Sequence, residues 1–584
     1  MAPATPRSNG SPSRRSLLSA TATGLTVAAS GCVRQTRNVL GRNPTDQLSM
    51  TIATVPSDYD TELVQLASLL GDALEAVGID VSIEYLAQVE FLRTVLVNHD
   101  FDLYVGRHPG DVDPDFLYEL LHSRYADESG WQNPFGFTSM AFDERLEAQR
   151  DLDGDQRREE VAEILTGVAN EQPFVPICMP IERRIVRTDR FEGWGDDHPT
   201  TRLGYLGLDP LANDDSFAGA ITDTRPTINL NPLSVEYRGE GPLVSLVYDS
   251  LGTAVDDEVR PWLASEWEWD GSTATVTLRD DCRWHDGEVL TADDVAFTYR
   301  FLEDTSLGES EAPSPPPLYR GRAAAVSSVA VDPEDTLTLT IDVDATPAVG
   351  ERAFTVPILP EHVWTDRTND ADVAGFGTTP GTTEAVVTDN VPPIGSGPFQ
   401  FVERTERESL VLEQFDDHFS RRSMTLPAAT AETVRIVVHP RSASAIEAVK
   451  DGDVDVTITP LAPGLAGGVN ESAPIRLLES PSRAFYHVGF NARNAPCSNP
   501  YFRRTVARLL DKAWIVEEVF EGQAIPVGTP MTGEWVPEKL AWDGTDPAVP
   551  FLGTDGEFNE TVARTAFEEA GFEYDDEGRL LARH

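Results

Sequence analysis

A regular alternation of strand-like and helix-like segments near the start of the chain restricts the fold most. Residues 49–55, 79–85 and 101–105 are short runs rich in apolar and β-branched side chains, which is typical of strands. Between the first two runs, leucines and a valine in 63–77 repeat at helical spacing before Gly78, a residue that commonly ends helices. Strand–helix–strand alternation predicts a parallel sheet covered by helices on both faces, and therefore an α/β fold.

A second patterned region lies in the middle of the chain. Residues 267–279 alternate apolar and polar side chains around an Asp-Gly turn, which predicts a β-hairpin. Thr291 is followed three residues later by Asp294, a short form of the capping box that begins a helix. Apolar side chains in 295–302 then share one helical face.

The charge of the chain excludes several classes of partner. Among 584 residues, 97 are acidic and 46 basic, giving a formal charge of −51, and only three of the basic residues are lysines. Such a chain repels nucleic acid and anionic lipid surfaces, so we expect no nucleic-acid partner. We interpret the acidic, lysine-poor composition as halophilic, since concentrated salt screens repulsion between carboxylates. The alternative is an acidic secreted protein of ordinary salt tolerance.

The N-terminus has the features of an export and anchoring segment. Arg14 and Arg15, followed by two leucines, resemble a twin-arginine export signal. The apolar run 17–30 is shorter than the roughly 20 residues that span a bilayer, and it ends at Cys32 in a sequence that resembles a lipobox. We therefore expect 1–32 to be a signal, 33–47 to be a tether, and the mature protein to be lipid-anchored at the extracellular face of the membrane. The alternative is an unstructured basic tail.

The sequence carries no motif for catalysis or metal binding. HExxH, GxSxG, GxGxxG and CxxC are all missing, and no two histidines stand four residues apart. Cys178, Cys282 and Cys497 are far apart, so they allow at most one disulfide and require none. We expect no enzyme activity, no metal and no cofactor.

Several short segments together resemble the family 5 solute-binding proteins of ABC importers, the peptide and nickel binders. The first is Trp284-His285-Asp286-Gly287 with the helix that follows it, and the others are 226–232, 358–364, 394–399 and 490–512. The resemblance implies a two-lobed periplasmic-binding-protein-like fold with an additional domain, which closes on a ligand held between the lobes. It also implies ABC permease subunits with their ATPases as partners, and a monomeric state.

The order of these segments differs from the order in the family. Residues 48–185 resemble the C-terminal segment of family members, yet here they come first. Residues 196–220 are rich in Asp, Gly, Pro and Ala and predict a linker, after which the family's own beginning follows. The resemblance therefore implies a circular permutation. The expected parts are a far lobe (48–185 with 457–584), a first lobe (186–256 with 334–456, including the linker) and a small domain (257–333).

The same resemblance implies where a ligand binds. In peptide-binding members an aspartate before an Asp-Pro-Asp turn meets the ammonium group of the ligand, and a tryptophan lines the pocket. Carried over, these positions are Asp111 and His108, although the loop is one residue shorter and Asp113 is an alternative. The further candidates are Arg107, Tyr486 and Asn491, with core packing as the alternative role of the last two.

The negative charge of this loop also limits which ligands fit. A carboxylate in a closed cleft needs a cation, which a ligand amine supplies, unless Arg107 neutralises Asp111 internally. We therefore expect delivery of peptides, or of a related amine-containing solute, to an ABC importer. The alternatives are a ligand-sensing module for a membrane receptor and a secreted hydrolase.

Overall fold

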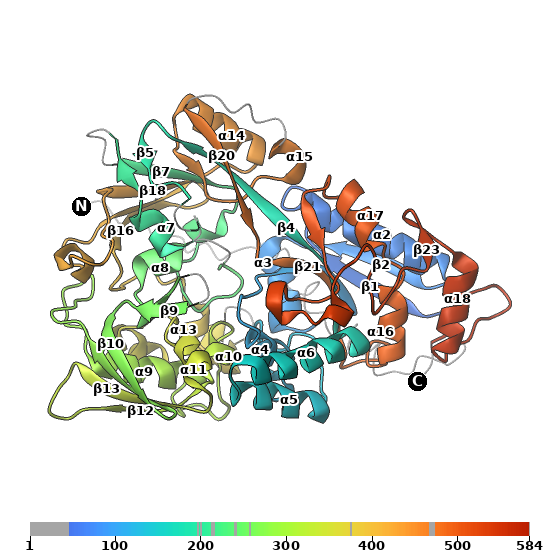
Figure 1. The fold of residues 1–584 in the computed structure, drawn as a ribbon, viewed down its shortest axis with the longest axis horizontal. Coiled ribbons are helices and arrows are strands. Elements are labelled where there is room, and N and C mark those ends of the chain that lie inside the picture. The colour runs from blue at the N-terminus through green and yellow to red at the C-terminus, as the bar shows by residue number, and fades with distance from the viewer. Residues whose placement is uncertain are drawn as a thin grey trace, which may run out of the picture.

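One 12-stranded sheet runs through the molecule in the computed structural model (Figure 1). The structure describes residues 46–582 except 196–197, 199–200, 212–215, 239–241, 256–257, 374–376 and 467–473. The main path is β16-β17-β18-β7-β19-β4-β21-β3-β1-β2, with β20 and β22 also paired to β4. These strands are β1 (Ser49–Thr54), β2 (Asp80–Tyr85), β3 (Leu103–His108), β4 (Phe174–Arg187), β7 (Ser216–Ile221), β16 (Phe399–Thr405), β17 (Ser409–Gln414), β18 (Thr433–Val438), β19 (Val456–Thr457), β20 (Ile475–Pro481), β21 (Phe485–Phe490) and β22 (Ala524–Pro526).

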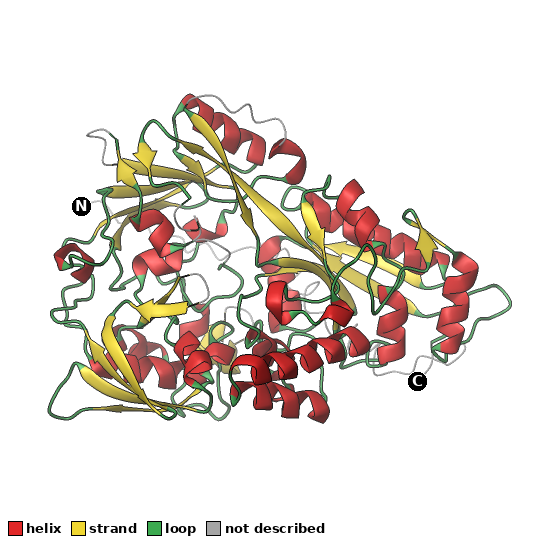
Figure 2. Cartoon of the chain, viewed as in Figure 1, coloured by secondary structure: helices red, strands yellow, loops and turns green. Residues whose placement is uncertain are grey.

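The predicted α/β alternation at the start of the chain is confirmed. β1 pairs in parallel with β2 and with β3, and α2 (Thr61–Ala76) connects the first two strands. The Asp60 side chain caps α2 by accepting a hydrogen bond from the Leu63 N–H at 2.9 Å. Helices lie alongside the strands of this part of the molecule (Figure 2).

A separate four-stranded sheet forms the small domain, which we define as 264–353. Its order is β10 (Ala264–Asp270), β11 (Thr273–Leu278), β13 (Thr338–Val343) and β12 (Val326–Val331), so the predicted hairpin is confirmed. α9 (Ala292–Glu303) begins with the predicted capping box of Thr291 and Asp294. The expected boundary at 333 is wrong, because β13 is an interior strand of this sheet.

The expected linker 196–220 is also partly wrong. It contains α7 (Arg202–Leu206) and β6 (Asp209–Pro210), and its last residues begin β7, which is paired in parallel with β18 and β19. The alanines of β7 are buried against α14 (Ser442–Asp451). A composition that is typical of linkers here supplies small side chains for close packing of a helix on a strand.

The molecule contains two large hydrophobic cores. One combines residues of 48–179 with residues of 485–582, and we call this body the far lobe. The second is built from 186–458 and includes the small domain; the remainder of it is the first lobe. The Leu48 N–H donates to the Leu580 carbonyl at 2.7 Å, so both ends of the described chain meet in the far lobe. Figure 1 shows this as blue and red elements lying together at the right.

Shorter elements complete the structure. The remaining helices are α3 (Gln88–Leu92), α4 (Phe116–Leu121), α5 (Met140–Arg150), α6 (Gly154–Glu171), α8 (Leu243–Val247), α10 (Arg320–Ala323), α11 (Pro347–Ala353), α12 (Glu361–Trp364), α13 (Glu384–Val387), α15 (Pro463–Ala466), α16 (Pro500–Ala507), α17 (Lys512–Glu518) and α18 (Glu560–Glu569). Two-stranded pairs are β5 (Phe191–Glu192) with β6, β8 (Gly252–Val255) with β9 (Glu258–Pro261), β14 (Asp370–Val373) with β15 (Gly377–Thr383), and β23 (Gly553–Thr554) with β24 (Glu557–Phe558).

The predicted signal and anchor cannot be compared with the structure. Arg14, Arg15, Cys32 and most of the tether lie outside the described residues. Within the described part of the chain, no helix is both long and apolar enough to cross a membrane. Cys178, Cys282 and Cys497 are buried free thiols.

Candidate functional site

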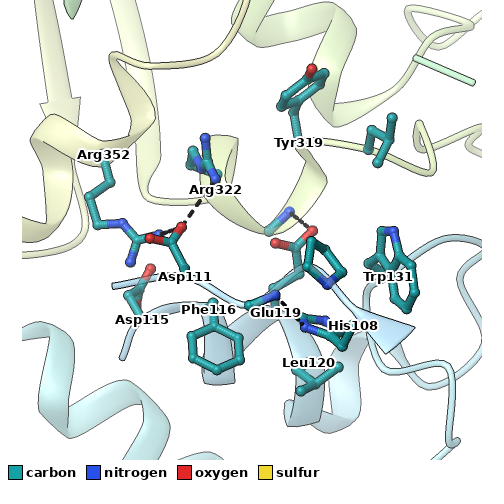
Figure 3. Close-up of a pocket in the computed structure, with 14 residues that line it drawn as sticks. His108, Asp111, Asp115, Phe116, Glu119, Leu120, Trp131, Tyr319, Arg322 and Arg352 are labelled. Carbon is teal, nitrogen blue, oxygen red and sulfur yellow. Dashed lines mark hydrogen bonds and ion pairs between the residues drawn. The ribbon is translucent and has the colours of Figure 1, made fainter. Parts of the chain in front are cut away.

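A small cavity lies where the far lobe meets the small domain (Figure 3). Its volume is about 130 Å³. The far lobe contributes the end of β3, the loop after it, α4 and Trp131, and the small domain contributes α10 and α11. The lining residues are His108, Pro109, Gly110, Asp111, Asp115, Phe116, Glu119, Leu120, Trp131, Leu318, Tyr319, Gly321, Arg322 and Arg352.

The loop between β3 and α4 is held in a fixed shape. Gly110 has φ +64°, and a Cβ atom there would lie 2.0 Å from the Arg483 carbonyl oxygen, so only glycine fits. The Asp111 carboxylate accepts a hydrogen bond from the Val112 N–H, and the Asp113 carboxylate accepts one from the Asp115 N–H, both at 2.7 Å. Such side-chain-to-backbone bonds fix the direction of both aspartates.

Arginines of the small domain neutralise these aspartates. Arg352 donates to the Asp111 carboxylate and, at 2.7 Å, to Asp113, while Arg322 lies 3.2 Å from Asp111. Arg157 of α6 also contacts Asp113 at 2.7 Å. Figure 3 shows Asp111 between Arg352 and Arg322. Burial alone would raise the pKa of Asp113, but Arg352 and Arg157 outweigh it and hold that pKa well below its usual range.

The premise that a ligand must supply the cation for Asp111 therefore does not hold in this structure. Arg107, the expected internal partner, lies 3.2 Å from Glu182. The partners that Asp111 does have, Arg322 and Arg352, come from the small domain. Its role as a ligand anchor stays a prediction, and so does that of Asp113, which does not line the cavity.

His108 lines the cavity as a neutral ring. It is 5% exposed, and burial, together with the nearby His487, holds its pKa well below the usual value. Its Nδ1 accepts a hydrogen bond from the Gly110 N–H at 2.9 Å. The ring contacts Trp131 edge-on, with 4.8 Å between ring centroids. His108 is therefore an uncharged aromatic part of the cavity wall.

Tyr486 and Asn491 are not among the residues that line the cavity. The Tyr486 hydroxyl donates to the Asp60 carboxylate at 3.0 Å. Asn491 is 2% exposed, and its amide donates to the carbonyls of His99 and Phe101 at 3.0 and 2.9 Å. Asn491 therefore holds the segment that enters β3, and the ligand-binding roles of Tyr486 and Asn491 stay predictions.

A larger cleft of about 1410 Å³ lies between the far lobe on one side and the first lobe and small domain on the other. Arg93 and Val97 line it from the far lobe, and Glu236 and Phe297 from the opposite side. Arg93 bridges the two sides through an ion pair with Glu236 at 3.2 Å. The segment 317–322 borders both cavities, since Pro317 and Arg320 line the cleft and its other residues line the small cavity.

Sequence reasoning missed most of the small cavity. Glu119 had a local signal, because it stands four residues after Asp115 and so lies on the same side of α4. Trp131, Tyr319, Arg322 and Arg352 had none. Arg322 and Arg352 meet Asp111 across 211 and 241 residues of sequence.

Nothing among the described residues forms a metal centre. No group of three or more His, Cys, Asp or Glu side chains there is arranged to hold a metal ion. The His285 ring contacts the Gly397 carbonyl oxygen at 3.0 Å, and Asp286 pairs with His362 at 2.8 Å. His285 therefore bonds to a backbone carbonyl, and its neighbour Asp286 pairs with a different side chain, His362.

Comparison with known proteins places the chain in a family. The family "Bacterial extracellular solute-binding proteins, family 5 Middle" matches residues 258–582, which is more than half of the chain. The oligopeptide-binding protein AppA of Bacillus subtilis is 24% identical over 314 residues, covering 52% of this chain and 50% of AppA. The dipeptide-binding protein DppE of the same organism is 21% identical over 313 residues, covering 52% of each. The chain thus matches about half the length of these relatives.

A solved structure gives a weaker likeness. The structure of AppA from Bacillus subtilis with a nonapeptide is 18% identical, with a TM-score of 0.45 over 62% of this chain and 66% of that one. Family membership therefore rests on the sequence match. The family is one of binding proteins, not of enzymes. The chain belongs to the family 5 extracellular solute-binding proteins.

Proposed function

We propose that this chain is an extracellular, membrane-anchored binding protein that delivers peptides, or related amine-containing small solutes, to an ABC importer. The observation that carries the proposal is the 1410 Å³ cleft between the lobes of a family 5 chain. Pockets for small molecules usually measure about 300–1,000 Å³, so this cleft has room for an oligopeptide. Relatives named for oligopeptide and dipeptide binding favour the same class of ligand.

The arrangement of the lobes fits a binding protein that closes on its ligand. β4 is shared by both lobes: Phe174 pairs with β21 of the far lobe, and Val186 pairs with β19 of the first lobe. A strand that continues from one lobe into the other, as β4 does, can act as a hinge. Permease subunits with their ATPases would then receive the ligand from a monomeric protein held by a lipid on Cys32 after twin-arginine export.

Among the residues proposed from the sequence, His108 and Asp111 border the small cavity. We place Arg107, Asp113 and Tyr486 behind them, as supports of the loop and of β3.

Ligand binding tests the function directly. The protein, purified in molar salt, is stripped of bound molecules by reversible unfolding, and the released compounds are identified by mass spectrometry. We expect peptides or other amines, and calorimetry with trialanine, compared with N-acetylated trialanine, should show saturable binding of the free-amine form. Release of no small molecule, together with no binding of either tripeptide, would contradict the proposal. Uptake of labelled trialanine that persists after deletion of the gene would contradict the transport role.

We also propose that the chain is a circular permutation of its family. The shared far-lobe core and the bond between Leu48 and Leu580 support this interpretation, because a short connection could join the two ends. A variant that joins 582 to 46 and opens the chain at 199 tests it. We expect a folded protein with unchanged binding. A variant that aggregates or loses cooperative unfolding would contradict the permutation.

A further inference from the structure

One carboxylate of the small cavity differs from its neighbours in having no ion pair. Asp111 contacts Arg322 and Arg352, and Asp115 contacts Arg150 at 2.7 Å. Within the described part of the chain, Glu119 lies in no ion pair within 4 Å, and the hydrogen bond that it accepts comes from the Gly321 N–H at 3.3 Å. Burial of this carboxyl raises its pKa, and Arg322 offsets the rise only in part.

The backbone of the small domain is shaped around Glu119. A Cβ atom at Gly321 would lie 2.3 Å from the Cβ of Glu119, so only glycine allows this approach. Tyr319, two residues earlier, has φ +67° and ψ −6°, a left-handed conformation that is unusual for a bulky side chain. Strained residues of this kind are frequent at ligand clamps. The segment 319–321 therefore holds an aromatic ring and a glycine at the cavity at some conformational cost.

Aromatic side chains form much of the remaining wall. Trp131, Phe116 and the neutral His108 ring come from the far lobe, and Tyr319 comes from the small domain. Figure 3 shows Glu119 near the centre of this group, with Trp131 to one side and Tyr319 above it. An acidic group among aromatic faces favours organic cations, because the ring faces are electron-rich.

We propose that this cavity binds an alkylated ammonium group of the ligand, with Glu119 as its counter-charge and with Trp131 and Tyr319 against its alkyl substituents. The inference rests on the proposed function, and it assigns the cation to Glu119 and not to Asp111. Asp111 acts as a positioning residue for Arg322 and Arg352.

The size of the cavity agrees with this assignment. A volume of about 130 Å³ is well below the roughly 300–1,000 Å³ of a pocket for a whole small molecule. That is room for a methylated ammonium group but not for a whole peptide. The rest of the ligand extends past 317–320 into the larger cleft. Because the walls come from both the far lobe and the small domain, the cation binds across the interface that closes.

Choline and its neutral carbon isostere, 3,3-dimethylbutan-1-ol, test the charge without a change of shape. We expect choline to bind the stripped full-length protein at least tenfold more tightly than the alcohol, as measured by calorimetry and by tryptophan fluorescence. Glu119→Gln should lose at least tenfold in choline affinity, and Trp131→Leu should also weaken it. Glu144→Gln on the exposed side of α5 is the matched control and should behave as wild type.

Several outcomes would overturn the inference. They are equal binding of choline and the alcohol by wild type, no binding of choline, or unchanged affinity in Glu119→Gln. The wild-type comparison remains decisive if a variant fails to fold. Trialanine binding without choline binding would remove this inference and leave the proposed function standing. Choline binding that depends on Glu119, in a protein that binds no peptide, would keep this inference and restrict the proposed function to amine-containing solutes other than peptides.

Discussion

Arg352→Met tests whether the ion pairs at the small cavity hold the lobes together. Arg352 belongs to the small domain, and both of its carboxylate partners, Asp111 and Asp113, belong to the far lobe. Its side chain is 12% exposed, and theirs are 17% and 20% exposed, so solvent screens these pairs only weakly. Methionine keeps the length of the side chain and removes its charge and donors.

The free energy lost in Arg352→Met depends on the ion pairs that Asp111 and Asp113 keep. Removing one partner of a buried ion pair typically costs about 3–5 kcal/mol. Here Asp111 keeps Arg322 at 3.2 Å and Asp113 keeps Arg157 at 2.7 Å, so the loss is smaller. We expect the closed form to lose about 2 kcal/mol relative to the open form, which shifts their ratio roughly 30-fold.

Small-angle X-ray scattering of the ligand-free protein measures this shift. The radius of gyration of Arg352→Met should exceed that of wild type, and saturating ligand should restore the smaller value. Arg157→Met is the matched control, because Arg157 and Asp113 lie in the same lobe. It should lower the unfolding midpoint without enlarging the protein. Equal radii of gyration for wild type and Arg352→Met would refute the role of these pairs in closure.

Four further predictions concern stability, the cavity and location. The unfolding midpoint should rise between 0.1 and 1 M NaCl. The reason is that the screening length falls from about 10 to about 3 Å, which weakens repulsion between the 97 acidic side chains. A midpoint that does not change would contradict the halophilic interpretation. Burial, and then the nearby Asp60, raise the pKa of Glu62 to about 7. The protonated side chain therefore stabilises the folded state fully below the unfolded pKa of about 4.5, and this stabilisation is lost as the pH rises through 7. Glu62→Gln should therefore raise the urea midpoint relative to wild type at pH 8 more than at pH 5, and an equal difference at both values would count against the shift. Gly321→Ala should lower the thermal midpoint and weaken choline binding, because its Cβ collides with Glu119; wild-type values for both would show that the segment adapts. Cys32→Ala should release mature protein into the medium, and unchanged retention on membranes would argue against a lipid anchor.

The parts of the fold that the sequence predicted are those encoded by nearby residues. α2, with strands on either side of it, follows from a periodic apolar pattern and an end at glycine. The two members of the capping box, Thr291 and Asp294, are three positions apart, so the box could be recognised without knowledge of the tertiary structure. Both features depend on local backbone geometry, which the sequence specifies directly.

The parts that were missed depend on contacts between distant segments. β7 has the small side chains of a linker, and it is an interior strand because it pairs with both β18 and β19 and packs against α14. Arg322 and Arg352 resemble other surface arginines until the fold brings them to Asp111. The sequence therefore pointed to the loop at 107–113, part of which borders the small cavity, but not to the arginines that face it.

Hydrogen–deuterium exchange of the stripped full-length protein, with and without a saturating amount of the ligand identified by mass spectrometry, tests the central claim most directly. If the ligand binds between the far lobe and the small domain, backbone amides of both 108–120 and 318–322 should exchange more slowly when it is present. Protection of only one of these segments, or protection confined to other regions, would contradict a binding site between the lobes.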